Sequence, residues 1–202
     1  MIDLLKEKIK LPLPGSPAQY KMAGAFRKKI DPPDDVIPSA VMILLFPFEN
    51  SYHFLLIERT SNNPNDRHSG QMSFPGGRRD PEDIDFQATA LRELHEELGI
   101  NPSQIEIIGN LTQLYIPVSN YIVHPYIGFT ESDFQIVPQL TEVKSVISVP
   151  LLSLFDEQNI KTTTIEYQNG VRLTNVPYFE LGGKVVWGAT AMILSELRDL
   201  LS

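Results

Sequence analysis

Three glutamates stand close together and form the part of the sequence best suited to chemistry. Glu93, Glu96 and Glu97 are spaced i, i+3 and i+4, which places their carboxylates on one face if the segment is helical. Like charges at this spacing destabilise a helix by about 0.2–0.5 kcal/mol per pair, so a compensating positive charge is expected. Oxygen ligands favour a hard divalent cation such as Mg²⁺. The spacing alone leaves a solvated acidic helix face open as the alternative.

Positively charged side chains precede this cluster in a chain that is acidic overall. With 25 Asp and Glu against 17 Lys and Arg, the formal charge is −8, which disfavours nucleic acid and anionic membranes as partners. Arg59, Arg67 and His68 are therefore candidates to bind the phosphates of a small anionic substrate. The alternative is that Arg59 forms an ordinary salt bridge at a strand end and that the other two decorate a loop.

The bulk composition indicates one soluble domain. A chain of 202 residues can bury one sizeable core, and no stretch divides it into halves that would each fold alone. The lack of cysteine excludes disulfides, thiolate zinc sites and a cysteine nucleophile. Residues 1–13 lack the apolar run of a signal peptide, and no segment reaches the roughly 20 apolar residues of a membrane span. We therefore expect a cytoplasmic protein with no membrane partner.

The best helical pattern spans residues 86–98. Leucines at i, i+3 and i+7 form its apolar stripe, Gly99 ends it, and Asp83 or Asp85 can cap its N-terminus. Further helices are predicted at residues 2–10, 18–22 and 189–201. Strands are predicted at residues 36–45, 54–57, 71–74, 105–111, 121–129, 146–149, 162–167 and 171–179, and turns at residues 49–51, 75–77 and 169–170. This order predicts an α/β protein with a mixed β-sheet packed between helices.

The segment from Gly77 to Ile100 resembles the signature of the Nudix hydrolases, G-x5-E-x7-R-E-U-x-E-E-x-G-U, in which U is a bulky aliphatic residue. The second half of the signature matches completely from Arg92 to Ile100. The first half departs, because Asp83 stands in place of the first glutamate and eight residues, instead of seven, separate it from Arg92. This departure leaves Asp83 with no expected role beyond a helix cap.

The resemblance implies a Nudix fold and a division into an N-terminal helical extension, residues 1–33, and a Nudix hydrolase domain, residues 34–202. It implies that Glu93, Glu96 and Glu97 bind Mg²⁺ or Mn²⁺, joined by the backbone carbonyl of Gly77. The activity implied is metal-dependent hydrolysis of a phosphoanhydride bond.

Two further roles follow from the same resemblance. Arg92 is expected to orient Glu93 through a salt bridge. Because the family sometimes takes its general base from outside the motif, Glu142 is a candidate for that role, although a loop glutamate is more often only solvated. His95 occupies the variable position of the signature and receives no role.

The segment upstream of the signature resembles the coenzyme A diphosphatase branch of the family, with its L-L-T-x-R-S-A element and a loop ending in G-x3-F-P-G-G. The matching positions are Leu55, Leu56, Arg59, Gly70, Phe74, Pro75, Gly76 and Gly77. Ile57, Thr60-Ser61 and Asp66 depart from the pattern. The resemblance implies hydrolysis of coenzyme A or an acyl-CoA to 3′,5′-ADP and 4′-phosphopantetheine. Arg59, Arg67, His68 and Gly76 are the expected substrate-binding residues.

Two alternatives stay open. One is a Nudix diphosphatase that acts on another nucleoside diphosphate derivative, such as ADP-ribose or a dinucleotide. The other is a non-catalytic module that binds a nucleotide, which the complete set of Arg92, Glu93, Glu96 and Glu97 argues against. The expected partner is a small nucleotide rather than nucleic acid, and a homodimer is left open. Trp187 is expected to fill the core.

Overall fold

The computed structural model describes residues 1–60, 70–166 and 170–202. Its central sheet is mixed and consists of β1 (Ile37–Phe48), β2 (Ser51–Arg59), β3 (Met72–Ser73), β4 (Gly76–Arg78), β5 (Glu106–Asn110), β6 (Leu114–Ile116), β7 (Tyr121–Phe129) and β8 (Val143–Pro150). The strand order is β3-β2-β1-β7-β5, while β4 pairs with β1, β6 with β7 and β8 with β2. The β1–β7 pair is parallel, and the other pairs are antiparallel.

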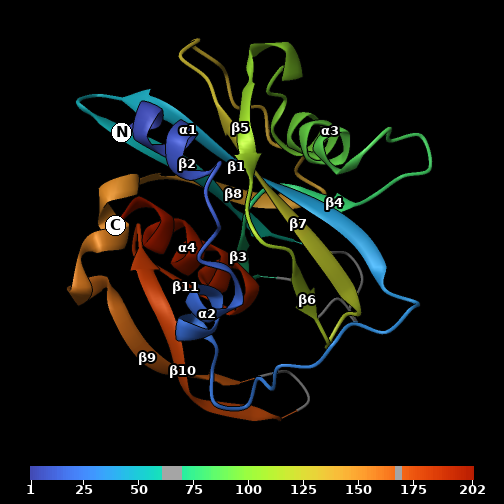
Figure 1. Ribbon diagram of the computed structural model, residues 1–202, viewed down its shortest axis with the longest axis vertical. Helices are drawn as coiled ribbons and strands as arrows, with labels where there is room; N and C mark the ends of the chain where they lie inside the picture. The colour runs from blue at the N-terminus through green and yellow to red at the C-terminus, as the bar shows by residue number, and fades with distance from the viewer. Residues whose placement is uncertain (61–69, 167–169) are drawn as a thin grey trace.

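Helices cover both faces of this sheet (Figure 1). The α-helices are α1 (Ile2–Lys8), α2 (Gly15–Gln19), α3 (Phe86–Leu98) and α4 (Gly188–Leu201), and the 3₁₀ helices are η1 (Tyr20–Met22), η2 (Pro102–Gln104), η3 (Leu151–Phe155) and η4 (Glu157–Asn159). Alternation along β1 separates the two layers, because Met42 and Leu44 pack with α3 whereas Ile43 and Leu45 pack on the side of α4. The predicted mixed sheet between helices is confirmed.

A second, three-stranded sheet was not expected. It consists of β9 (Ile160–Glu166), β10 (Arg172–Leu181) and β11 (Lys184–Trp187), in the order β11-β10-β9. The strands predicted at residues 162–167 and 171–179 pair with each other, apart from the central sheet. The predicted turn at Asn169-Gly170 lies partly outside the described residues. In Figure 1 this sheet lies beside α4, on the side of the molecule away from α3.

The prediction that residues 75–77 only stop a strand is wrong, because Gly76–Arg78 forms the strand β4 antiparallel to β1. Gly76 has φ 153°, and a Cβ there would lie 2.3 Å from the carbonyl oxygen of Ala40. Only glycine therefore allows this close pairing. The pairing depends on β1, a segment distant in the sequence, so local turn signals do not reveal it.

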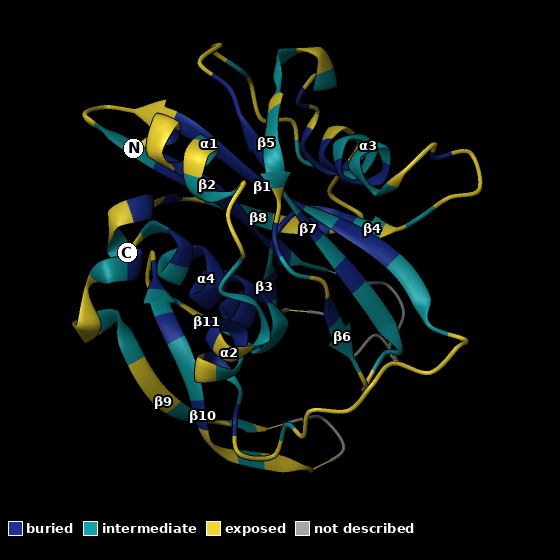
Figure 2. Cartoon of the chain, viewed as in Figure 1, coloured by how far each residue is buried: buried dark blue, intermediate teal, exposed yellow. Residues whose placement is uncertain are grey.

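The N-terminal segment packs onto α4. The helix predicted at residues 18–22 is shifted, since α2 ends at Gln19 and η1 follows it. Ile2 and Leu5 of α1 are buried in the same core as Leu194 and Leu197. Figure 2 shows α4 as one of the most buried elements, whereas α1 and β9 carry exposed residues. Within the described ranges, no helix has the length and apolar character needed to cross a bilayer.

Candidate active site

The carboxylates of α3 lie against β4 because the helix begins and ends as predicted. The side chain of Asp85 accepts a hydrogen bond from the Ala88 amide at 2.8 Å and caps the N-terminus. Gly99, with φ 72°, ends the helix in the left-handed conformation. The buried Leu94 and Leu98 fix the rotation of α3 against the sheet. The helix therefore turns Glu93 and Glu97 toward the backbone of residues 76–77.

Glu97 is anchored by the backbone of β4. Its Oε2 accepts a hydrogen bond from the Gly76 amide at 2.8 Å. The side chain is 1% exposed, and Oε1 has no hydrogen-bond partner. Arg59 Nη1 lies 3.6 Å from this oxygen, farther than a hydrogen bond. Burial raises the pKa of Glu97 to about 8, although the Gly76 amide and Arg59 act in the opposite direction.

Glu93 lies beside the next residue of β4. A Cβ on Gly77 would come within 2.6 Å of Glu93 Oε1, so the glycine makes room for the carboxylate. Burial raises the pKa of Glu93, and the neighbouring Arg92 opposes that shift. Backbone from Gly76 to Gly77 and two of the glutamates thus form one compact group.

Arg92 bridges several acidic side chains. Its Nη1 donates to Glu93 at 3.0 Å and to Glu96 at 2.8 Å. Its Nη2 donates to the carbonyl oxygen of Arg78 at 3.0 Å. Asp83 accepts hydrogen bonds from Arg92 Nε at 3.0 Å and from Nη2 at 2.9 Å, a two-pronged geometry that fixes the guanidinium plane.

The expectation that Asp83 has no role beyond a cap is wrong. Asp85 is the cap, while Asp83 is buried and also accepts hydrogen bonds from the Thr89 hydroxyl and the Asp80 amide, both at 2.9 Å. The Arg92 guanidinium holds the pKa of Asp83 well below its usual range. The shifted spacing before Arg92 hid this contact. The one available signal was an acidic residue near the position where the signature has glutamate.

The remaining expected residues lie at different distances from this group. Glu96 has a side chain that is 55% exposed and turned toward Arg92. Glu142 is exposed, and its negative charge contributes to the raised pKa values of Glu93 and Glu97. Its carbonyl accepts a hydrogen bond from the Thr60 amide at 2.8 Å. The predicted substrate residues Arg67 and His68 lie outside the described part of the chain.

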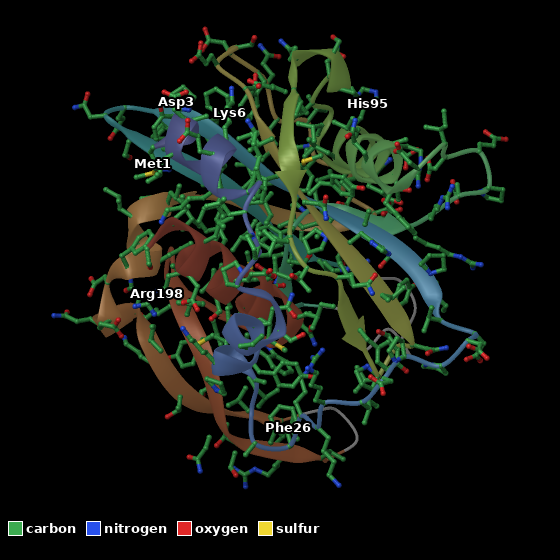
Figure 3. The ribbon with its side chains drawn as sticks, in the orientation of Figure 1. Met1, Asp3, Lys6, Phe26, His95 and Arg198 are labelled. Carbon is green, nitrogen blue, oxygen red and sulfur yellow. The ribbon has the colours of Figure 1, made fainter. Side chains whose placement is uncertain are left out.

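His95 points away from this group. It is exposed on α3, where Figure 3 labels it, and its Nδ1 lies 3.2 Å from the carbonyl oxygen of Ile100. This position gives no reason to assign it a role in the site.

Comparison with known proteins identifies the family. The NUDIX domain matches residues 36–165. The chain belongs to the NUDIX domain family. It is 46% identical to mouse peroxisomal coenzyme A diphosphatase NUDT7 over 85 residues, which cover 42% of this chain and 36% of that protein. It is 37% identical to human mitochondrial coenzyme A diphosphatase NUDT8 over 149 residues, which cover 73% of this chain and 63% of that protein. In each case the chain spans less than two thirds of the relative.

Solved structures share the Nudix fold at low sequence identity. The Nudix hydrolase RenU from M. smegmatis gives a TM-score of 0.56 at 16% identity and covers 89% of this chain and 92% of its own. The NUDIX domain of Shewanella oneidensis NrtR, solved with ADP ribose, gives a TM-score of 0.52 at 18% identity and covers 86% of this chain and 94% of its own. These likenesses support the fold alone.

The expectation of a cytoplasmic location is wrong by the same comparison. The relatives named above are peroxisomal and mitochondrial, and Nudix hydrolase 15 of Arabidopsis thaliana, 29% identical over 180 residues, is mitochondrial. Neither the acidic composition nor the pattern of residues 1–13 determines the cellular location.

Nudix hydrolases generally need divalent metal ions, and the donor set of this Nudix site suits one. All the donors are oxygens, as hard cations require. The buried Oε1 of Glu97 lacks a hydrogen-bond partner and has the Arg59 guanidinium 3.6 Å away. Burying a carboxylate oxygen without hydrogen bonds is costly unless positive charge compensates it, and a divalent cation would add to that charge. In the described ranges no three acidic or histidine side chains converge into a ready-made metal site. Arg92 bridges Glu93 and Glu96 instead.

An ion-pair cluster around the buried Glu58, the residue before Arg59, was not foreseen from the sequence. Glu58 of β2 is 8% exposed and accepts hydrogen bonds from Lys144 at 2.5 Å, Lys184 at 2.9 Å and the Ser145 hydroxyl at 3.0 Å. These contacts, led by Lys144 and Lys184, lower the pKa of Glu58 to about 2. The cluster ties β2 to β8 and to β11 of the second sheet.

Proposed function

We propose that this Nudix protein hydrolyses the diphosphate bond of coenzyme A or an acyl-CoA, releasing 3′,5′-ADP and 4′-phosphopantetheine. The observation that carries the chemistry is the buried carboxylate of Glu97 beside Glu93 and the glycine backbone, because its Oε1 accepts no hydrogen bond and has the Arg59 guanidinium 3.6 Å away. The substrate is supported by the two coenzyme A diphosphatases at 46% and 37% identity. It is also supported by Arg59, whose guanidinium lies 3.6 Å from the carboxylate of Glu97.

We infer that Glu93, Glu96 and Glu97, with the carbonyl of Gly77, hold Mg²⁺ or Mn²⁺. When bound, the cation neutralises the diphosphate and lowers the pKa of a water. The protein's own contribution is positioning. Arg92, itself held by Asp83, keeps the carboxylate of Glu93 in place, and the amide of Gly76 does the same for Glu97.

Glu97→Gln tests the role of the carboxylates. The variant keeps the hydrogen bond from Gly76 but loses the charge, so we expect kcat to fall by about two to three orders of magnitude with the fold intact. Steady-state kinetics and circular dichroism measure both properties. The matched control is Glu166→Gln, since Glu166 is 63% exposed and lies on β9. Unchanged turnover in Glu97→Gln would contradict the metal assignment.

Glu142 is the proposed general base, accepting a proton from the attacking water. Its exposure and its electrostatic influence on Glu93 and Glu97 support this role. General-base catalysis contributes about 10²–10⁴-fold, so Glu142→Gln should reduce kcat by that order while KM changes little. A proportionate rise in KM with unchanged kcat would instead indicate a binding role.

Arg59, Arg67, His68 and Gly76 are the proposed substrate-binding residues. A guanidinium that binds the 3′-phosphate of coenzyme A in a two-pronged way would favour it over the 3′-dephosphorylated form by about tenfold or more in kcat/KM. Arg59→Gln should remove most of that preference, whereas the exposed Arg172→Gln should keep it. Equal kcat/KM for the two substrates in the unmodified protein would contradict the phosphate contact.

The proposal extends to the organisation of the chain. We propose residues 1–33 as the N-terminal extension and residues 34–202 as the Nudix domain. The formal charge of −8 supports a small nucleotide rather than nucleic acid as the partner. A homodimer stays a prediction that sedimentation velocity tests.

A further inference from the structure

A pocket of about 70 Å³ lies between the N-terminal segment and the second sheet. Its walls include Met22, Phe26, Arg27, Val176, Trp187 and Met192. Phe26, labelled in Figure 3, lies on the stretch of chain between α2 and β1 and is 45% exposed. The pocket is therefore lined by apolar side chains, is partly open to solvent at Phe26, and reaches the start of α4. Neither the catalytic carboxylates nor Arg59 line it.

Arg27 is a positively charged residue among these mostly apolar lining residues. Arg27 Nη2 donates to the carbonyl oxygen of Tyr115 at 2.7 Å, and the nearby Tyr20 side chain favours the charged form of the guanidinium. Its Nε is buried and has no hydrogen-bond partner. Burial lowers the pKa of Arg27. Among the residues that the structure describes, no carboxylate forms an ion pair with this guanidinium.

A half-buried guanidinium without a carboxylate is electrostatically incomplete. Removing a charge from water costs free energy unless an opposite charge compensates it. The neutral carbonyl oxygen of Tyr115 supplies a hydrogen bond but no negative charge. An anionic group on a ligand would supply it, and the apolar side chains around Arg27 would contact the rest of that ligand.

Contacts between α4 and β3 link the wall of the pocket to the part of the chain that holds the Glu97 carboxylate. The hydroxyl of Thr190 donates to the carbonyl oxygen of Met72 at 3.0 Å, and the adjacent Ala189 lines the pocket. Met72 precedes Gly76, whose amide binds Glu97, by four residues. Four residues of extended chain span at most about 14 Å. The pantetheine arm of coenzyme A has roughly as many backbone bonds as four residues, so its extended length is comparable to this upper limit.

We propose that this pocket binds the acyl group of an acyl-CoA and favours a short aliphatic chain that ends in a carboxylate, paired with Arg27. The inference rests on the proposed coenzyme A diphosphatase function and names its substrate class. A volume of about 70 Å³ holds a few groups of water size, which suits a short chain better than a purine ring. The apolar walls take the methylene groups, and the guanidinium takes the terminal carboxylate in a two-pronged contact.

Kinetics with matched thioesters test the preference. Glutaryl-CoA is butyryl-CoA with a carboxylate added at the end of the chain. We expect kcat/KM to favour glutaryl-CoA by about tenfold in the unmodified protein. Arg27→Gln should abolish this preference, Arg27→Lys should restore part of it, and Arg172→Gln on the exposed face of β10 should keep it. Thermal unfolding verifies that each variant is folded.

Two kinetic results would overturn the proposal. One is an unmodified protein that does not prefer glutaryl-CoA. The other is an Arg27→Gln variant whose kcat/KM falls equally for coenzyme A and for both thioesters, and does not fall for their 3′-dephosphorylated forms. That second pattern would place the 3′-phosphate, not the acyl carboxylate, at Arg27.

A binding measurement separates the pocket from the hydrolytic activity. Trp187 is the only tryptophan in the chain and lines the pocket, so its fluorescence reports occupancy. S-glutaryl-pantetheine, which has no diphosphate, should change the fluorescence saturably in the unmodified protein and bind about tenfold more weakly to Arg27→Gln. Saturable binding without hydrolysis of coenzyme A would support the pocket and contradict the enzyme. Hydrolysis of coenzyme A without saturable binding would overturn the pocket and leave the enzyme standing.

Discussion

The contact between Asp83 and Arg92 illustrates what residue spacing does and does not reveal. Helix periodicity is local, so the spacing of Glu93, Glu96 and Glu97 correctly predicts that they share a helix with Arg92. The loop before α3 is not periodic, and its path decides that Asp83 meets the guanidinium. Glu58 was missed for a related reason, because its lysine partners come from distant strands. Long-range ion pairs require the fold to be known.

Asp83→Asn should disturb the position of the proposed catalytic carboxylates without replacing any proposed metal ligand. The substitution removes the charge that holds Arg92, so we expect kcat to fall about 10- to 100-fold and unfolding free energy to fall by about 1–3 kcal/mol. Asp80→Asn is the matched control, since Asp80 is 59% exposed and lies 3.9 Å from Arg92; its effect should stay below about 1 kcal/mol. Kinetics and urea unfolding measure both. Equal effects of the two substitutions would contradict a positioning role for Asp83.

Helices and strands with a regular pattern of apolar residues could be predicted from the sequence. Short strands that are defined only by their pairing with another strand could not. α3 and the strand β7 lie where their apolar patterns predict them. β4 and β11 are short, with three and four residues, too short for a period to show. Their positions depend on β1 and β10. The Glu58 cluster then connects β2 with β11 across the two sheets.

The Glu58 cluster should make stability depend on pH. The pKa of Glu58 is lowered from 4.5 to about 2 in the folded state, so its contribution is complete above about pH 4.5 and is lost as pH falls toward 2. Because Lys144 is 65% exposed, we expect on the order of 1–2 kcal/mol. Glu58→Gln should lower unfolding free energy at pH 7 and have a smaller effect at pH 3. The control Glu180→Gln, 41% exposed on β10, should show little effect at either pH. A Glu58→Gln effect that grows on acidification would contradict the ion-pair account.

At the scale of the whole molecule, the N-terminal segment is part of the core. A buried carboxylate on α4 holds it, because Glu196 is 0% exposed and accepts hydrogen bonds from Gly15, Gln19 and Thr112 at 3.1, 2.8 and 3.2 Å. The sequence indicated a helical extension but not its attachment, since Glu196 and Gly15 lie at opposite ends of the chain. The attachment also places residues 22–27 along the wall of the apolar pocket.

Glu196→Gln should loosen this attachment. The amide can accept at one oxygen only, so one or more of the three donors loses its partner, and we expect unfolding free energy to fall by about 1–3 kcal/mol. Hydrogen exchange should quicken first in residues 1–33. The control Glu157→Gln removes a carboxylate that is 76% exposed and should leave exchange in that segment unchanged. Hydrogen exchange that quickens equally across the chain, with no excess in residues 1–33, would contradict a local attachment by Glu196.

Product analysis is the most direct test of the proposed hydrolysis of the coenzyme A diphosphate bond at the carboxylates of α3. Purified protein incubated with coenzyme A and Mg²⁺ or Mn²⁺ should release 3′,5′-ADP and 4′-phosphopantetheine in equal amounts, resolved by liquid chromatography and mass spectrometry. Removal of the cation by a chelator should stop the release. Coenzyme A that stays intact with either cation, while ADP-ribose or a dinucleotide is cleaved, would contradict the account.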